Sequence, residues 1–124
     1  MKKIVQTTSA PKAIGPYSQA IVTDALFFSS GQLGIDIQTG KLADGVEAQA
    51  IHAMQNLGEV LAAESLGYGH IVKTTIFLKD MADFSIVNTA YQSFFPGEFP
   101  ARSTVQVAAL PLGASVEIEC IAIR

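Results

Sequence analysis

The stretch "FPARSTVQVAALPLGASVEIECIAIR", residues 99–124, predicts two β-strands, at 101–110 and 115–124, around the short turn "PLG". Successive side chains of a strand point to opposite faces of its sheet. The second strand therefore has one apolar row and one half-polar row. The apolar row consists of Val116, Ile118, Cys120 and Ala122. We expect this row to pack against helices, so the stretch decides which face of the sheet is the core.

The first of these strands starts beside Arg102, one of only two arginines in the chain. If the two strands form a hairpin, Arg102 lies opposite Ile123. Arg102 and Glu117 are then expected on the same face, turned away from the helices. They would be about 20 Å apart, at ~3.3 Å per residue. A site that uses both side chains would have to take one of them from a neighbouring subunit.

The rest of the chain predicts four more strands and two helices. The strands are expected at 2–7, 17–22, 25–30 and 70–80, and the helices at 44–67 and 84–95. The first helix has an N-cap candidate in Asp44, with Glu47 completing a capping box, and a stop candidate in Gly67. Asp80 or Asp83 would cap the second. We expect a single α+β domain over 1–124, with one mixed β-sheet and both helices on one face.

The composition indicates a protein that associates with copies of itself. Charged residues make up 15% of the 124 residues, hydrophobic residues 49%, and the net charge is −3, whereas ~25% charged residues is typical. Subunit interfaces have few charges at their centres. We therefore expect a homo-oligomer, in which another subunit covers the sheet face opposite the helices.

The composition also disfavours several other classes of partner. No stripe of Lys and Arg marks a nucleic-acid surface. The chain contains no apolar run near the ~18 residues of a membrane span, and no apolar signal region follows the first lysines. The single cysteine, Cys120, fits a reducing compartment, so we expect a cytoplasmic protein. His52 and His70 belong to no ligand cluster, so we expect no metal.

Four motifs in this order resemble the RidA/YjgF family, and together they cover essentially the whole chain. They are "IGPYSQA" (14–20), "FFSSGQLG" (27–34), "VNTAYQSFF" (87–95) and "FPARSTVQVAALPLGASVEIECIAI" (99–123). The resemblance implies a chorismate mutase-like fold that assembles into a trimeric barrel, with a site in each cleft between subunits. It also implies hydrolytic deamination of 2-imino acids, 2-iminopropanoate and 2-iminobutanoate, to 2-oxo acids and ammonia, without a metal or cofactor.

The same motifs imply roles for individual residues. Arg102 would bind the substrate carboxylate, because a guanidinium offers paired donors that match it. Glu117 would position or deprotonate the attacking water, and we expect a raised pKa for it on a covered face. The remaining substrate-binding candidates are Tyr17, Ser30, Gly31, Asn88, Ser103 and Thr104. Thr104 stands where many family members have cysteine, which argues against a covalent thiol step. The connection at 96–99 is shorter than in many relatives, which leaves the substrate range open.

Other interpretations of these residues remain open at this point. An arginine at a strand end is commonly a surface or interface residue. The same cleft could belong to a non-catalytic, trimeric regulatory protein that binds a small metabolite. A nuclease or translation inhibitor, as ascribed to some relatives, is disfavoured by the acidic chain. Glu117 separates the first two functions best, because hydrolysis needs a group that directs water and binding does not.

Overall fold

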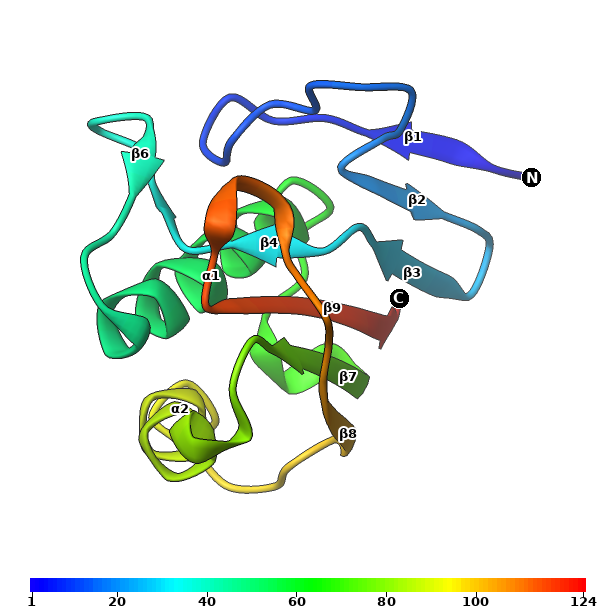
Figure 1. Ribbon diagram of the computed structural model, residues 1–124. Coiled ribbons are helices and arrows are strands. Elements are labelled where there is room, and N and C mark those ends of the chain that lie inside the picture. The colour runs from blue at the N-terminus through cyan, green and yellow to red at the C-terminus, as the bar shows by residue number, and fades with distance from the viewer.

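The computed structural model describes residues 1–124, and it contains one seven-stranded sheet, one two-stranded sheet and two α-helices. The large sheet has the order β1-β2-β3-β9-β7-β8, with the short strand β4 also paired to β9 (Figure 1). Its strands are β1 Lys3–Val5, β2 Ala20–Val22, β3 Leu26–Ser29, β4 Gln32–Leu33, β7 Ile71–Leu78, β8 Ala101–Gln106 and β9 Val116–Ile123. Strands β5 Ile35–Asp36 and β6 Lys41–Leu42 form the small sheet. The helices are α1 Val46–Ala62 and α2 Phe84–Gln92.

Both helices cover the same face of the large sheet, as the alternation predicted. The apolar row of β9 is buried, and it joins the inward residues of α1 and α2 in one hydrophobic core. The mixed sheet and the placement of the helices confirm the predicted α+β class. The strands predicted at 17–22 and 25–30 are also present, and as β2 and β3 they pair antiparallel on either side of Thr23 and Asp24.

The ends of the helices differ in part from the predicted ones. Helix α1 begins after Gly45, whose φ of 91° turns the chain, and no side chain caps it. The predicted capping box at Asp44 is therefore wrong. The helix ends before Gly67, because Ser65 adopts the left-handed conformation (φ 60°) and Leu66 N–H donates to Leu61 O at 3.1 Å.

The start of the second helical segment agrees with one of the two predicted caps. Asp80 Oδ1 accepts a hydrogen bond from Ala82 N–H at 2.9 Å. This bond caps the 3₁₀ turn Met81–Asp83, which leads directly into α2. Asp83, the other candidate, makes no side-chain cap.

The last two strands do not form a hairpin, which corrects the predicted register. Strand β7 lies between them: β8 pairs with it in parallel and β9 pairs with it antiparallel. Two further 3₁₀ turns, Tyr68–His70 before β7 and Pro111–Gly113 between β8 and β9, complete the chain. Strand β9 lies in the middle of the sheet, between β3 and β7, and its apolar row is buried under the helices. Burial of this row outweighs the short connection that favoured a hairpin.

This topology places Arg102 and Glu117 on opposite faces of the sheet, contrary to the prediction. Thr74 of β7 pairs with both Arg102 and Cys120, so Arg102 shares the helix-covered face with the buried row of β9. Glu117 pairs with Phe77 and belongs to the alternate, open face. The two side chains still cannot meet within one subunit, but the reason is that they lie on opposite faces of the sheet and not that they are far apart along one face.

Candidate functional site

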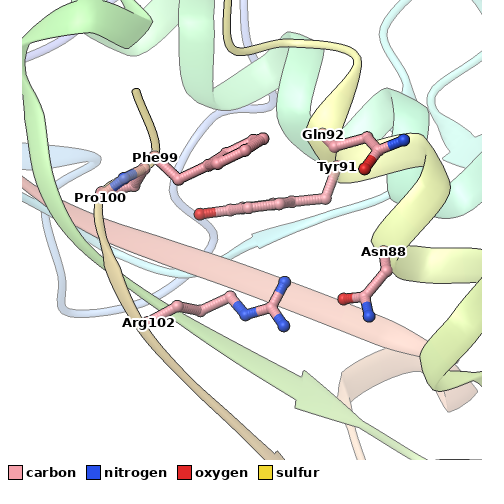
Figure 2. Close-up of a pocket in the computed structure, with 6 residues that line it drawn as sticks. All are labelled: Asn88, Tyr91, Gln92, Phe99, Pro100 and Arg102. Carbon is pink, nitrogen blue, oxygen red and sulfur yellow. The ribbon is translucent and has the colours of Figure 1, made fainter. Parts of the chain in front are cut away.

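Arg102 lies in a cleft between the start of β8 and helix α2. The cleft has a volume of about 320 Å³ and is lined by Asn88, Tyr91, Gln92, Phe99, Pro100 and Arg102. In Figure 2 the guanidinium extends below the ring of Tyr91 and toward the amide of Asn88. Its central carbon lies 5.2 Å from the centroid of Tyr91 and 5.5 Å from that of Phe84. Arg102 forms no ion pair, so its charge is held by aromatic faces and left without an anion.

Glu117 lies in a second, larger cavity on the open face of the sheet. This cavity has a volume of about 550 Å³. Most of its wall is apolar, and its polar wall includes Tyr17, Gly31, Gln32 and Glu117. Burial, and secondly the nearby carboxylate of Glu119, raise the pKa of Glu117 above its ordinary value. The predicted direction of this pKa shift is confirmed.

Gly31 determines how closely Glu117 approaches the backbone. A Cβ atom at position 31 would lie 2.7 Å from both Cδ and Oε2 of Glu117, which is closer than a real side chain tolerates. The carboxyl group therefore rests against a backbone position that has no side chain. The neighbouring Leu33 of β4 pairs with Glu117, so the same short strand supports this arrangement.

Polar side chains fix the loop that carries Tyr17 along the rim of the Glu117 cavity. The buried amide of Gln19 accepts from Thr7 N–H at 2.7 Å and donates to the carbonyls of Thr7 and Pro11 at 3.1 and 2.8 Å. Ser30 Oγ donates to Ser18 O at 2.6 Å, immediately beside Tyr17. Ser30 thus supports the rim, whereas the Tyr17 ring itself stays half exposed.

Five of the eight predicted site residues thus fall into two clusters in one subunit. Asn88 accompanies Arg102, and Tyr17 and Gly31 accompany Glu117. Ser103 lies in neither cavity; its hydroxyl accepts from Lys73 Nζ at 3.3 Å on the open face. The sixth candidate, Thr104, follows Arg102 on the helix-covered face, and its hydroxyl is buried without a hydrogen-bond partner.

The aromatic residues around Arg102 were not among the predicted site residues. Phe84 and Tyr91 hold the guanidinium, and Phe99 lines the same cleft. A signal was present, because Phe84, Asn88 and Tyr91 are spaced i, i+4 and i+7 and so share one face of α2. The chain has no group of three His, Cys, Asp or Glu side chains arranged to hold a metal ion. Neither helix has the length and apolar character needed to cross a membrane.

These features define a class: a small α+β protein with an unneutralised arginine in one cleft and a carboxyl group of raised pKa in another. The chain matches the family model described as Endoribonuclease L-PSP over residues 7–124. Reactive Intermediate Deaminase A, chloroplastic, of Arabidopsis thaliana is 53% identical over 98% of this chain, which spans 65% of that protein. The 2-iminobutanoate/2-iminopropanoate deaminase of Mus musculus is 49% identical, over 100% of this chain and 93% of its own.

Solved structures agree with the sequence relatives. The YjgF gene product from E. coli superposes with a TM-score of 0.95 at 43% identity, over 98% of each chain. E. coli TdcF with bound serine gives a TM-score of 0.95 at 41% identity, again over 98% of each chain. The chain belongs to the Endoribonuclease L-PSP family, which confirms the resemblance to RidA/YjgF proteins that its motifs predicted.

Replacement of Gly31 by alanine should move the carboxyl group of Glu117. The added methyl would force Glu117 out of its present rotamer, at a small cost in stability because the atoms that it meets are the end of a flexible side chain. Gly67→Ala is the matched control, because a Cβ there meets nothing within 4 Å. We expect Gly31→Ala to lower the rate of any reaction that depends on Glu117 by about tenfold or more. Equal rates in the two variants would contradict the close-approach role.

The raised pKa of Glu117 makes a prediction for stability against pH. Below its ordinary value of 4.5 the carboxyl group is protonated in both the folded and unfolded chains. As the pH rises, the unfolded chain ionises first, and the folded state loses stability until the pH exceeds the raised pKa. Urea unfolding should therefore show Glu117→Gln gaining stability relative to wild type above pH 4.5, and no gain below it. Glu98→Gln, in an exposed loop, controls for loss of one negative charge. A pH-independent difference would contradict this assignment.

Proposed function

We propose that this protein catalyses the hydrolytic deamination of 2-imino acids, such as 2-iminopropanoate and 2-iminobutanoate, to 2-oxo acids and ammonia. The observation that carries the proposal is the unpaired guanidinium of Arg102, set in a cleft of a chain that closely resembles named deaminases of these imines. The human and Salmonella typhimurium proteins of the same name are each 45% identical over 100% of this chain.

Arg102 anchors the carboxylate of the imino acid. Its planar guanidinium offers two parallel donors, and no carboxylate of the chain competes for them. The aromatic rings beside it attract the cation without neutralising it. The amide of Asn88, toward which the guanidinium points, supplies a further polar contact for the bound acid (Figure 2).

Glu117 directs the water and transfers the proton. Its carboxylate takes a proton from water as the oxygen bonds to C2 of the protonated imine, giving a neutral carbinolamine. Glu117 returns this proton to the nitrogen, the C2–N bond breaks and releases ammonia, and the carboxylate takes the hydroxyl proton as the C2=O group forms. Its raised pKa lies closer to neutral pH than that of an ordinary carboxyl group, so Glu117 can both accept and return a proton.

Thr104 contributes to the Arg102 half of the site. Its hydroxyl is buried and unsatisfied in the subunit, a condition that costs about 1–3 kcal/mol. It lies two residues beyond Arg102 on the same strand face. Thr104 does not itself line the cleft, so its contribution is to the packing beneath Arg102.

The complete site forms between subunits of a homotrimer. The two clusters lie on opposite faces of one sheet, so a second subunit has to bring Arg102 to Glu117. The open face has the apolar character of an interface, with exposed fractions of 62% for Ile4, 39% for Phe28 and 48% for Ile123. Ile4 and Phe28 belong to one continuous cross-strand row with Ile21 and Ile121.

A second candidate function is binding without catalysis. The structure of E. coli TdcF contains bound serine, which shows that a close relative holds a small amino acid. An Arg102 cleft could then serve a metabolite-binding regulatory trimer. Glu117 separates the two functions, because only hydrolysis requires it to exchange protons.

The direct test follows 2-oxobutanoate formation from 2-iminobutanoate, generated in situ from threonine by a dehydratase. We expect acceleration that is proportional to protein concentration. Arg102→Ala should lower kcat/KM by about 10- to 100-fold, since it removes a charge-assisted hydrogen bond. Glu117→Gln should lower kcat by about 10²–10⁴-fold. Binding of 2-oxobutanoate without any acceleration would favour the regulatory function instead.

Mixed oligomers test whether the site spans two subunits. Arg102→Ala and Glu117→Gln are each expected to be nearly inactive alone. After co-refolding at equal amounts, about a quarter of the clefts should combine an intact arginine with an intact glutamate, because subunits assort at random in a cyclic trimer. Each variant refolded alone is the control. Failure to recover activity, with mass spectrometry showing mixed oligomers, would mean that the site is not shared.

A further inference from the structure

We propose that Tyr91, held by its hydroxyl to Thr74, is a positioning residue that sets the direction of the Arg102 guanidinium. This inference rests on the proposed function for its kinetic consequence. Arg102 has many rotamers and no ionic partner that would select one of them. Among the described contacts, the rings of Phe84 and Tyr91 are what hold the guanidinium.

Tyr91 differs from Phe84 because its ring is fixed at both ends. Its Cα belongs to α2, and its hydroxyl lies 2.7 Å from Thr74 Oγ1, in the buried core. A ring that is held at both ends gives the neighbouring cation a more defined position. Phe84 is only partly buried and has no such polar anchor.

The register of the sheet makes Thr74 the natural anchor for this purpose. Thr74 is the residue of β7 that pairs with Arg102 of β8. The contacts therefore close a ring: Arg102 lies on Tyr91, Tyr91 bonds to Thr74, and Thr74 pairs with Arg102 through the backbone. Movement of α2 relative to the sheet would break one of these contacts. The contacts therefore fix the position of the guanidinium relative to β8, the strand that carries Arg102.

The hydroxyl of Tyr91 acts through the position of the ring and does not face the bound acid. In Figure 2 the hydroxyl lies at the Pro100 end of the cleft, whereas the guanidinium extends toward Asn88. Burial raises the pKa of Tyr91, with smaller opposing contributions from Thr74 and Arg102. The group therefore stays protonated at neutral pH and remains a hydrogen-bonding neutral hydroxyl.

The chain offers a matched control in Tyr68. Its hydroxyl also makes one internal hydrogen bond, to Met54 O at 2.7 Å, and burial raises its pKa to about 12. Its ring packs on Phe94 and Phe95, and it makes no contact with Arg102. Tyr68→Phe therefore removes a comparable tyrosine hydrogen bond without touching the ring that holds the cation.

The experiment compares Tyr91→Phe, Thr74→Val and Tyr68→Phe by two measurements. The first is the ¹⁵N–¹H spectrum of the arginine side chains, which is simple because the chain has only Arg102 and Arg124. Arg124→Lys assigns the two signals. We expect the Arg102 Nε–H resonance to move in Tyr91→Phe and in Thr74→Val, and to stay in place in Tyr68→Phe. An unmoved resonance in Tyr91→Phe overturns the proposal.

The second measurement is steady-state kinetics with 2-iminobutanoate. Tyr91→Phe and Thr74→Val should each raise KM by about three- to tenfold with little change in kcat, because a misdirected anchor weakens ground-state and transition-state binding alike. The double variant should be no worse than either single variant. An unchanged KM, or the same rise in Tyr68→Phe, overturns the positioning role.

The two measurements also separate this inference from the function on which it rests. If Arg102→Ala retains the wild-type KM, the carboxylate anchor of the proposed function is wrong. If no variant and no wild-type protein hydrolyses the imine, the proposed activity is wrong. In both cases the arginine spectrum still decides whether Tyr91 and Thr74 position the guanidinium.

Discussion

The placement of β7 between β8 and β9 is the constraint on which the rest of this structure depends. Strand β7 pairs in parallel with β8 on one side and antiparallel with β9 on the other, through the same residues. The register with β7 therefore determines the face of the sheet to which each side chain of β8 and β9 points. Thr74 aligns Arg102 with the helix-covered core, and Phe77 aligns Glu117 with the open face. The helices, the aromatic cleft and the second cavity all follow from that assignment.

Local signals predicted most of the fold, whereas the pairing of distant strands was only partly predictable. The alternation in residues 115–124 and the β-branched run in 70–80 correctly predicted two strands, and the spacing of apolar residues predicted both helices. The predicted hairpin was wrong because it assumed that two strands adjacent in the sequence, at 101–110 and 115–124, pair with each other. The order strand, helix, strand over β7, α2 and β8 already indicated a parallel pair, since parallel strands need such a crossover.

The candidate site shows the same division between local and distant information. Motifs identified Arg102 and Glu117, but no pattern along a strand revealed that Phe84 and Tyr91 would hold the guanidinium. Those contacts require α2 to fold back over β8, which is a property of the tertiary packing. The close approach of Glu117 to Gly31 is likewise visible only in three dimensions, although a glycine inside a strand pattern often marks such an approach.

Opposite faces also preserve the chemical state that each group needs. Had Arg102 and Glu117 been neighbours on one face, they would have formed an ion pair, which lowers the pKa of a carboxyl group and occupies the donors of the guanidinium. Instead, aromatic rings hold the arginine without neutralising it, and burial raises the pKa of the glutamate. Each subunit thus keeps an unsatisfied cation and a carboxyl group with increased proton affinity. In the proposed site between subunits, a small acid would meet both groups, and its carboxylate would take the donors of the guanidinium that an ion pair with the glutamate would otherwise occupy.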